Sequence, residues 1–236
     1  MAEIPAEFAR YQRQIALENF GLEAQKNLKN SRAVLAGAGG VGSAAAGLLA
    51  GSGLGRLDIV DCDEVSMTNL HRQTIYKEAQ AGMPKAELAA KFAAELNGQC
   101  QTRAVYKKIQ DPAEFAQFLR GADICIDATD SFSARFAVSD ACKSMGIPLV
   151  YAAAKGFVSQ IVLFGGDFYL GDLVADKAAK AEEPQELPIF PASAHFSGVL
   201  AAGIAIRALS KTEKFCPGKI LSFDFSACKF KEISLR

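Results

Sequence analysis

The chain is organised around the stretch Ala33-Val34-Leu35-Ala36-Gly37-Ala38-Gly39-Gly40-Val41-Gly42, an apolar run that breaks into glycines and resumes with small apolar residues. This pattern predicts a strand, a tight turn and a helix. A glycine turn at a helix N-terminus forms an anion site, because free backbone N–H groups and the helix dipole both point at the bound group. The spacing of Gly37, Gly39 and Gly42, with Asp61 ending the next apolar run, is typical of NAD, FAD and ATP sites, where the aspartate accepts from ribose hydroxyls.

Length and composition predict a single domain that spans residues 1–236. Hydrophobic residues make up 50% of the chain and charged residues 22%, and the formal net charge of +0 provides no global field to recruit nucleic acid or an anionic membrane. The six cysteines form no C-x-x-C pair and the N-terminus has no basic-then-apolar signal, so we expect the protein to be located in the reducing cytoplasm. The stretch 33–55 is uncharged and long enough to span a bilayer, but its glycines favour the strand, turn and helix instead.

Strands and helices are predicted to alternate up to residue 154, after short helices over 1–30. The predicted strands are 33–38, 56–61, 101–109, 123–127 and 148–153, and the predicted helices are 41–51, 85–96, 112–119 and 131–145. This alternation indicates an α/β fold, with a Rossmann-like, mostly parallel twisted sheet and helices on both faces. A ligand then belongs at the carboxyl ends of the strands.

The pattern changes after residue 154. We expect antiparallel strands at 157–164 and 168–170, a helix at 193–209, and a closing hairpin of strands 219–224 and 230–234. The tract 175–187, rich in Ala, Lys, Glu and Pro, is predicted to be a mobile loop. The sequence thus divides into N-terminal helices (1–30), a nucleotide-binding core (31–154) and a C-terminal antiparallel extension (155–236).

Charged residues follow the predicted strand ends. Arg72 and Lys85 are each typical of a solvated surface, but two cations near a glycine loop supply donors that strengthen as charge builds on phosphoryl oxygens. Asp130 follows the strand 123–127, where either it or Ser131 can cap the next helix, or Asp130 can hold Mg²⁺ against a triphosphate. These residues alone leave both roles open. His71 and His195, the only histidines, are assigned no catalytic role.

Several motifs occur in a fixed order through most of the chain. They are Arg10-Tyr11-Gln12-Arg13-Gln14, Gly37 to Gly42, Asp61-Cys62-Asp63, Thr68-Asn69-Leu70-His71-Arg72-Gln73, Gly82-Met83-Pro84-Lys85 and Asp127-Ala128-Thr129-Asp130. In this order they resemble the ThiF/MoeB/HesA family, the bacterial relatives of ubiquitin-activating enzymes. The resemblance implies that the chain uses ATP to adenylate the C-terminal glycine of a small ubiquitin-fold sulfur carrier (ThiS/MoaD-type, ending in Gly-Gly), releasing pyrophosphate, in thiamin, molybdopterin or related sulfur-transfer biosynthesis.

The resemblance also implies roles for individual residues. Those matching the family's nucleotide-binding positions are Gly37, Gly39, Gly40, Gly42, Asp61, Asp63, Asn69, Arg72, Lys85, Thr129, Asp130 and Ser131. The catalytic set is Arg13, Arg72, Lys85 and Asp130, with Asp130 holding Mg²⁺. Because the arginine matching Arg13 reaches into the active site of the other subunit, a homodimer is implied.

The chain departs from the family pattern in its cysteines. Zinc-bearing members carry two C-x-x-C pairs, but the first region here, 167–172, contains no cysteine and no second pair follows, so we expect no zinc site. The region 187–197 also lacks the cysteine that some members link to the carrier, so the reaction is predicted to stop at the acyl-adenylate. Two alternatives remain open: an NAD-dependent oxidoreductase with the same glycine loop, and a non-catalytic relative that binds a carrier.

Overall fold

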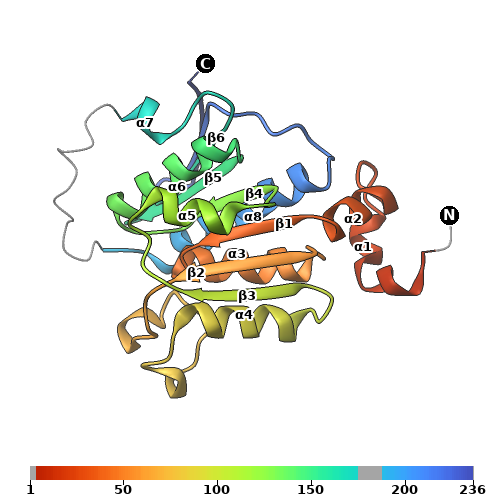
Figure 1. Ribbon diagram of the computed structural model, residues 1–236, viewed down its shortest axis with the longest axis horizontal. Helices are drawn as coiled ribbons and strands as arrows, with labels where there is room; N and C mark the ends of the chain where they lie inside the picture. Colours follow the sequence, from red (N-terminus) through yellow and green to blue (C-terminus); the bar gives the residue numbers. More distant parts are fainter. Residues whose placement is uncertain (1–3, 175–187, 236) are drawn as a thin grey trace.

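Figure 1 presents the computed structural model, which describes residues 4–174 and 188–235. Its strands are β1 (Arg32–Ala36), β2 (Arg56–Asp61), β3 (Gln101–Tyr106), β4 (Ile124–Asp127), β5 (Leu149–Lys155), β6 (Val158–Phe164), β7 (Lys219–Asp224) and β8 (Lys229–Ser234). Its helices are α1 (Gln12–Ile15), α2 (Gly21–Lys29), α3 (Gly40–Gly51), α4 (Lys85–Leu96), α5 (Pro112–Leu119), α6 (Phe132–Met145), α7 (Leu170–Leu173) and α8 (Pro191–Leu209). Short 3₁₀ turns are η1 (Ala6–Tyr11), η2 (Met67–Asn69) and η3 (Glu78–Gln80).

The eight strands of the described residues form one sheet in the order β3-β2-β1-β4-β5-β6-β7-β8. The five strands from β3 to β5 are parallel, and β6, β7 and β8 join them antiparallel. Leu35 of β1 pairs with Ile59 of β2 on one side and Ile126 of β4 on the other. The chain first adds β2 and β3 on one side of β1 and then β4 and β5 on its other side. The crevice at the carboxyl ends of β1 and β4 is therefore the topological switch point.

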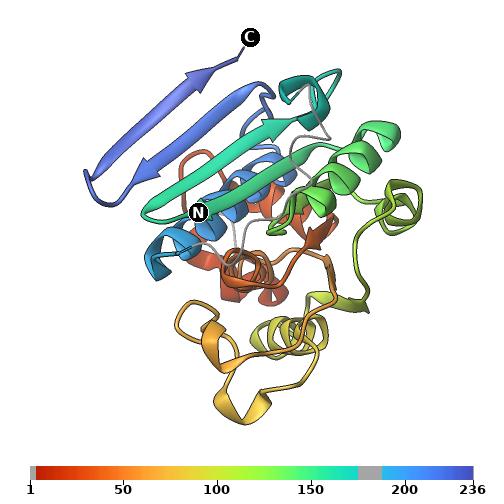
Figure 2. The same ribbon diagram turned by 90° about the vertical axis from the view of Figure 1, so that its left-hand side faces the viewer.

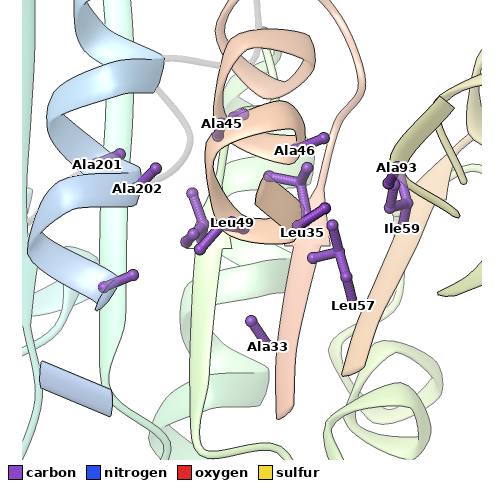
Figure 3. Close-up of a cluster of buried hydrophobic side chains, with 14 of the residues drawn as sticks. Ala33, Leu35, Ala45, Ala46, Leu49, Leu57, Ile59, Ala93, Ala201 and Ala202 are labelled. Atoms are coloured by element: carbon purple, nitrogen blue, oxygen red, sulfur yellow. The ribbon is translucent and has the colours of Figure 1, made fainter. Parts of the chain in front are cut away.

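Helices cover both faces of the sheet, as predicted. On one face, α3 and α8 bury small residues against the strands, which lets the helix backbones approach closely; Ala45, Ala46, Leu49, Ala201 and Ala202 lie there beside Leu35 and Leu57 (Figure 3). The opposite face is covered by α5 and α6, with Phe115 and Val138 in a second core. The hairpin of β7 and β8 forms the outer edge of the sheet (Figure 2).

Helix α8 is 19 residues long with a mean hydropathy of 1.4, which is long and apolar enough to cross a membrane by length and composition. Its side chains Ala194, Ala201 and Ala205 are fully buried in the core with α3 and the sheet. A core helix passes the same test, so this helix is weak support for a membrane span.

The N-terminal helices dock at the far end of α3 and α4. The Tyr11 hydroxyl accepts a 2.7 Å hydrogen bond from Asn97 Nδ2, and Gln14 Nε2 donates to the Ser52 carbonyl at 3.0 Å. Asn97 and Ser52 follow the last residues of α4 and α3. In Figure 1, α1 and α2 accordingly lie at the opposite end of the sheet from the segment that follows β2.

One predicted strand is wrong. Residues 168–170 were expected to be extended, but only Phe168 bridges Gly165, and the chain then turns into α7. The Asp172 carboxylate accepts from the Tyr169 N–H at 2.8 Å, and Ser139 Oγ accepts from the Leu170 N–H at 3.0 Å. These side-chain acceptors take the N–H groups that a strand ladder would have used. The predicted loop at 175–187 lies outside the described residues.

Candidate functional site

The glycine loop between β1 and α3 is held by close backbone contacts. A Cβ on Gly42 would lie 1.9 Å from the Gly37 carbonyl oxygen, and a Cβ on Gly37, whose φ is +91°, would lie 2.6 Å from the Ala128 carbonyl oxygen. Glycine is therefore required at both positions. The N-cap of α3 is Gly39, which offers no side-chain cap, so no capping side chain competes with an anion for the first-turn N–H groups.

Asp61 joins the glycine loop to the segment that follows β2. Its Oδ2 accepts from the Ala38 N–H at 2.6 Å and its Oδ1 from the Asp63 N–H at 2.7 Å. Burial raises the pKa of Asp61 above its ordinary value, and these N–H donors and the charge of Lys85 offset only part of that rise. Each carboxylate oxygen keeps a second lone pair, which is what the hydroxyls of a ribose would need.

The segment after Asp61 is fastened over the glycine loop. The buried Tyr76 hydroxyl donates to the Ala38 carbonyl at 2.7 Å. A Cβ on Gly40 would lie 3.1 Å from the Arg72 carbonyl oxygen and 3.2 Å from its Cγ. The same Arg72 carbonyl is 3.0 Å from His195 Nε2 on α8, the ring nitrogen that can donate to it. The glycine loop and α8 thus hold the backbone at Arg72 between them.

The Arg72 side chain is oriented by its neighbours. Its Nη2 donates to Asn69 Oδ1 at 3.0 Å, and its Nη1 lies 2.8 Å from His71 Nε2. Since arginine only donates, His71 accepts here through a neutral ring nitrogen. His71, assigned no catalytic role from the sequence, therefore touches a predicted catalytic residue.

Lys85 begins α4, and its side chain is only 4% exposed. Its Nζ donates to Asp63 Oδ2 at 2.8 Å, and the Asp63 side chain is 57% exposed. The lysine is thus a buried cation with one surface carboxylate as its ion-pair partner. A phosphate that entered the crevice could replace or join that carboxylate.

The turn after β4 separates the two roles that the sequence left open for Asp130. Ser131 Oγ accepts from the Ala134 N–H at 3.3 Å and caps α6, so the cap belongs to Ser131 and Asp130 stays exposed. Behind it, Asp127 is 1% exposed and its Oδ1 accepts from the N–H and the hydroxyl of Thr129, at 2.9 and 2.7 Å. Burial raises the pKa of Asp127. Its Oδ2 has no hydrogen-bond partner within the described residues.

Arg135 holds this turn from α6. Its Nε and Nη2 both donate to the Thr129 carbonyl, at 3.1 and 2.9 Å. The guanidinium lies 4.8 Å from the ring centroid of Tyr151 and donates to its hydroxyl. A planar, five-donor guanidinium fits this bifurcated contact, so Arg135 fixes the backbone that carries Asp130.

Most of the predicted site residues converge on this crevice. The contact between Gly37 and Ala128 joins the glycine loop to the turn after β4, and Tyr76 and Arg72 join it to the segment after β2. Arg13 is the exception, because it lies on α1 beside the C-terminal end of α3. Twelve residues of α3 separate that end from the loop, a length of about 18 Å.

The arrangement also contains contacts that the sequence reasoning missed. These are the hydroxyl of Tyr76, the buried amide of Gln73, the imidazole of His195 and the guanidinium of Arg135. Gln73 ends the motif that contains Asn69 and Arg72, so its place in the sequence is a signal that could have identified it. The others come from chain segments that only the folded structure brings to the loop.

The donor set is small for a metal centre. The described residues contain no group of three or more His, Cys, Asp and Glu side chains that could hold a metal ion. A Mg²⁺ held by the exposed carboxylate of Asp130 would therefore need phosphate oxygens and water for its remaining ligands, which is how Mg²⁺ is usually bound with nucleotides. Asp130 fits that limited role. The absence of zinc stays a prediction.

Together, the sheet order and the glycine loop at its switch point define a doubly wound α/β protein with a Rossmann-type loop. Solved structures of Escherichia coli MccB share this fold: the complex with ATP superposes with a TM-score of 0.84 at 22% identity, covering 98% of this chain and 74% of that one. The structure of MccB by itself gives a TM-score of 0.85 at 21% identity, covering 99% and 71%. At this identity the likeness concerns the fold alone.

The chain belongs to the ThiF family, whose model matches residues 11–236. It is 35% identical over 243 aligned residues to the molybdopterin-synthase adenylyltransferase of Escherichia coli strain K12, covering 100% of this chain and 96% of that protein. It is 33% identical over 234 residues to the adenylyltransferase and sulfurtransferase MOCS3 of Drosophila sechellia. That alignment covers 98% of this chain but only 51% of MOCS3, so the chain spans about half the length of that relative.

Proposed function

We propose that this chain adenylates the C-terminal glycine of a small ubiquitin-fold sulfur-carrier protein with ATP and releases pyrophosphate. The convergence of Arg72, Lys85 and Asp130 on the glycine loop is the observation that carries the proposal. Its support from relatives is the 35% identity, over nearly the whole length of both chains, to a molybdopterin-synthase adenylyltransferase. That relative favours a molybdopterin-type carrier over a thiamin-type one.

In the proposed reaction, a carboxylate oxygen of the carrier's terminal glycine forms a bond to the α-phosphorus of ATP. The bond from that phosphorus to the oxygen bridging to the β-phosphate breaks, and pyrophosphate leaves with the electron pair. The nucleophile is already ionised, so no general base is required. The chain's own residues contribute alignment and charge stabilisation.

Each site residue has a defined task in this proposal. Asp61 accepts from the ribose hydroxyls, and the first turn of α3 receives phosphate oxygens. Arg72 and Lys85 neutralise the charge that develops at the α-phosphorus and on the leaving pyrophosphate, and Asn69 holds the Arg72 guanidinium and offers its amide N–H to the phosphates. Mg²⁺, when bound, supplies further charge neutralisation, and Asp130 would hold it. Asp63, Thr129 and Ser131 shape the walls through the hydrogen bonds already described.

Arg13 carries the proposal of a homodimer. It lies beside the end of α3 that is away from the loop of its own chain, and α3 itself is about 18 Å long, so Arg13 can serve the reaction only in the crevice of a second copy. A variant mixture tests this directly. Arg13→Ala and Arg72→Ala protomers should each lose activity on their own, and mixing them should restore part of it because one crevice in the hybrid dimer is complete. No recovery on mixing would contradict the shared site.

The experiment for the main proposal is carrier-dependent exchange of labelled pyrophosphate into ATP. We expect exchange with a carrier that ends in Gly-Gly, none with the same carrier lacking its last two residues, and none with Arg72→Ala or Asp130→Ala. Retained exchange in both variants would contradict the proposal. Binding of NAD without binding of MgATP would favour the oxidoreductase alternative, and MgATP binding without any exchange would favour a non-catalytic relative.

A further inference from the structure

Gln73 is a buried amide beside the glycine loop whose side chain the protein leaves unsatisfied. It is 2% exposed, and its Oε1 has no hydrogen-bond partner among the described residues. Its backbone is fixed, since its N–H donates to the Asn69 carbonyl at 3.1 Å and its carbonyl accepts from the Tyr76 N–H at 3.2 Å. Buried amide oxygens are ordinarily hydrogen-bonded, so this residue calls for a reason other than packing.

The side chain faces the phosphate-binding part of the loop. A Cβ on Gly39 would lie 3.6 Å from Gln73 Nε2, and that nitrogen is the nearest atom it would meet. Tyr76 bonds to Ala38, and Gln73 and Arg72 lie where side chains on the next two loop residues, Gly39 and Gly40, would meet them. Along the loop, the amide therefore faces the residue between the one bonded by Tyr76 and the one approached by Arg72.

Gly39 differs from the other glycines of the motif. Gly37 and Gly42 have no room for a side chain, whereas a methyl on Gly39 would make an ordinary contact of 3.6 Å and its φ of −73° suits any residue. Packing of the protein therefore does not explain why position 39 is glycine. The space between Gly39 and the Gln73 amide is kept open at the N-terminus of α3, where an anion would bind.

We propose that Gln73 is a further nucleotide ligand, whose Nε2 donates a hydrogen bond to a phosphate oxygen bound over Gly39. The inference rests on the proposed function and extends it to a residue with no role so far. A leucine would fill the same buried position without an unsatisfied oxygen, so the amide is explained by what its nitrogen does. A neutral donor adds a directed hydrogen bond where Arg72 and Lys85 already supply the positive charge.

The test compares Gln73→Leu and Gln73→Glu with wild type, using calorimetric titration with MgATP and with adenosine, and thermal unfolding without ligand. Loss of a hydrogen bond to a charged group predicts an MgATP affinity about 10-fold weaker or more in Gln73→Leu. Adenosine affinity should be unchanged, because adenosine lacks phosphates. Gln73→Glu should weaken MgATP binding further, since a carboxylate repels phosphate. The melting temperature of Gln73→Leu should equal or exceed that of wild type.

Gln25→Leu is the matched control. Gln25 of α2 is also a fully buried amide, but it packs against the end of α3 that is away from the glycine loop. Both its polar atoms are hydrogen-bonded, since Nε2 donates to the Ser52 carbonyl and Oε1 accepts from Gln14 Nε2. Its replacement should lower the melting temperature and leave the MgATP affinity within twofold. Gly39→Ala should show the reverse, with a retained melting temperature and weakened MgATP binding.

Two outcomes are distinguishable from each other. If wild type binds MgATP and Gln73→Leu binds it equally well, the role of Gln73 is wrong while the proposed function stands. If wild type binds adenosine or NAD but not MgATP, the proposed function fails and the role of Gln73 fails with it. Should Gln73→Leu not fold, Gln73→Met, which keeps the unbranched side chain but has no donor, decides by the same ratio of MgATP to adenosine affinity.

Discussion

The two ends of the sheet both gather charged side chains, but they differ in how completely those side chains are paired. At the amino end, Asp58 is 1% exposed and accepts from Arg32 Nη2 at 2.7 Å and from Arg56 Nε at 2.8 Å. Arg32 also donates to the Phe118 carbonyl at 2.7 Å, and of its nitrogens the Nε alone lacks a partner within the described part of the chain. This cluster joins β1, β2 and the last turn of α5 into one framework.

The carboxyl end is arranged differently. Lys85 pairs with the exposed carboxylate of Asp63, and Arg72 with the side chains of Asn69 and His71. Two acceptors, Gln73 Oε1 and Asp127 Oδ2, have no partner among residues 4–174 and 188–235. Completed charge clusters serve the fold, whereas cations whose partners are exposed and replaceable are what an anion site requires before its ligand binds.

The largest effect on stability is expected from Asp58→Asn, which removes the charge shared by Arg32 and Arg56. Breaking a buried ion pair leaves uncompensated charge, so the free energy of unfolding should fall by about 3 kcal/mol or more in urea denaturation. MgATP affinity of the folded variant should stay within twofold. Asp123→Asn, an exposed partner of the Arg32 N–H, is the control and should have a much smaller effect. A parallel loss of MgATP affinity in Asp58→Asn would break the contrast between the two ends.

Arg72→Ala should have the opposite profile. Removing one donor aimed at developing charge typically raises the barrier by about 3–4 kcal/mol, so pyrophosphate exchange should fall at least 100-fold. Urea denaturation should change little, because the Arg72 side chain is bonded to surface groups. Arg103→Ala at the amino end, beside Asp58, is the matched control and should keep full exchange. Equal losses of exchange in the two arginine variants would contradict the account.

A smaller effect is expected from Arg135→Lys, which keeps the positive charge but not the forked donation to the Thr129 carbonyl. If Arg135 positions the turn that carries Asp130, the KM for MgATP should rise about 10-fold, as the loss of a charged hydrogen bond predicts. The KM for the carrier should not change. Lys143→Met, also on α6, removes a surface pair with Asp172 and serves as the control. A lower melting temperature with an unchanged KM would show that Arg135 is only structural.

The smallest effect concerns pH and Asp61. Burial raises the pKa of the Asp61 carboxyl above the ordinary 3.8, so this carboxyl binds its proton more tightly in the native state than in the unfolded chain. Its contribution to stability is therefore greatest below 3.8 and is lost as the pH rises through the raised pKa. Ribose hydroxyls need the ionised form as acceptor. Adenosine affinity should thus weaken on acidification before an ordinary aspartate would protonate, while Asp61→Asn should show a flat profile over the same range.

The sequence predicted the fold closely where periodicity and glycine chemistry act locally. The strand 56–61 and the helices 85–96 and 112–119 agree with β2, α4 and α5 at both ends. The strand predicted at 168–170 failed because side chains far away in sequence, such as Ser139, take its backbone donors. Apolar alternation over so few residues carries no information about such partners.

The candidate site was predictable in part for the same reason. Glycine spacing and strand-end acids placed Gly37, Asp61 and Asp130 at the carboxyl end, which the fold brings together. The cap of α6 could not be assigned from sequence, since Ser131 and Asp130 are both good caps. Arg135 and His195 act through long-range contacts, so no local pattern identified them. The assignment of site residues to nucleotide and metal stays a prediction.

The central claim is that the incomplete charge cluster at the carboxyl end serves adenylyl transfer. The most direct measurement is the intact mass of a Gly-Gly carrier after incubation with the wild-type protein, MgATP and pyrophosphatase. The account predicts a carrier heavier by one adenylyl group, two phosphates released for each carrier adenylated because pyrophosphatase hydrolyses the pyrophosphate, and no change in carrier mass with Arg72→Ala. An unmodified carrier from a wild-type protein that binds both MgATP and the carrier would contradict it.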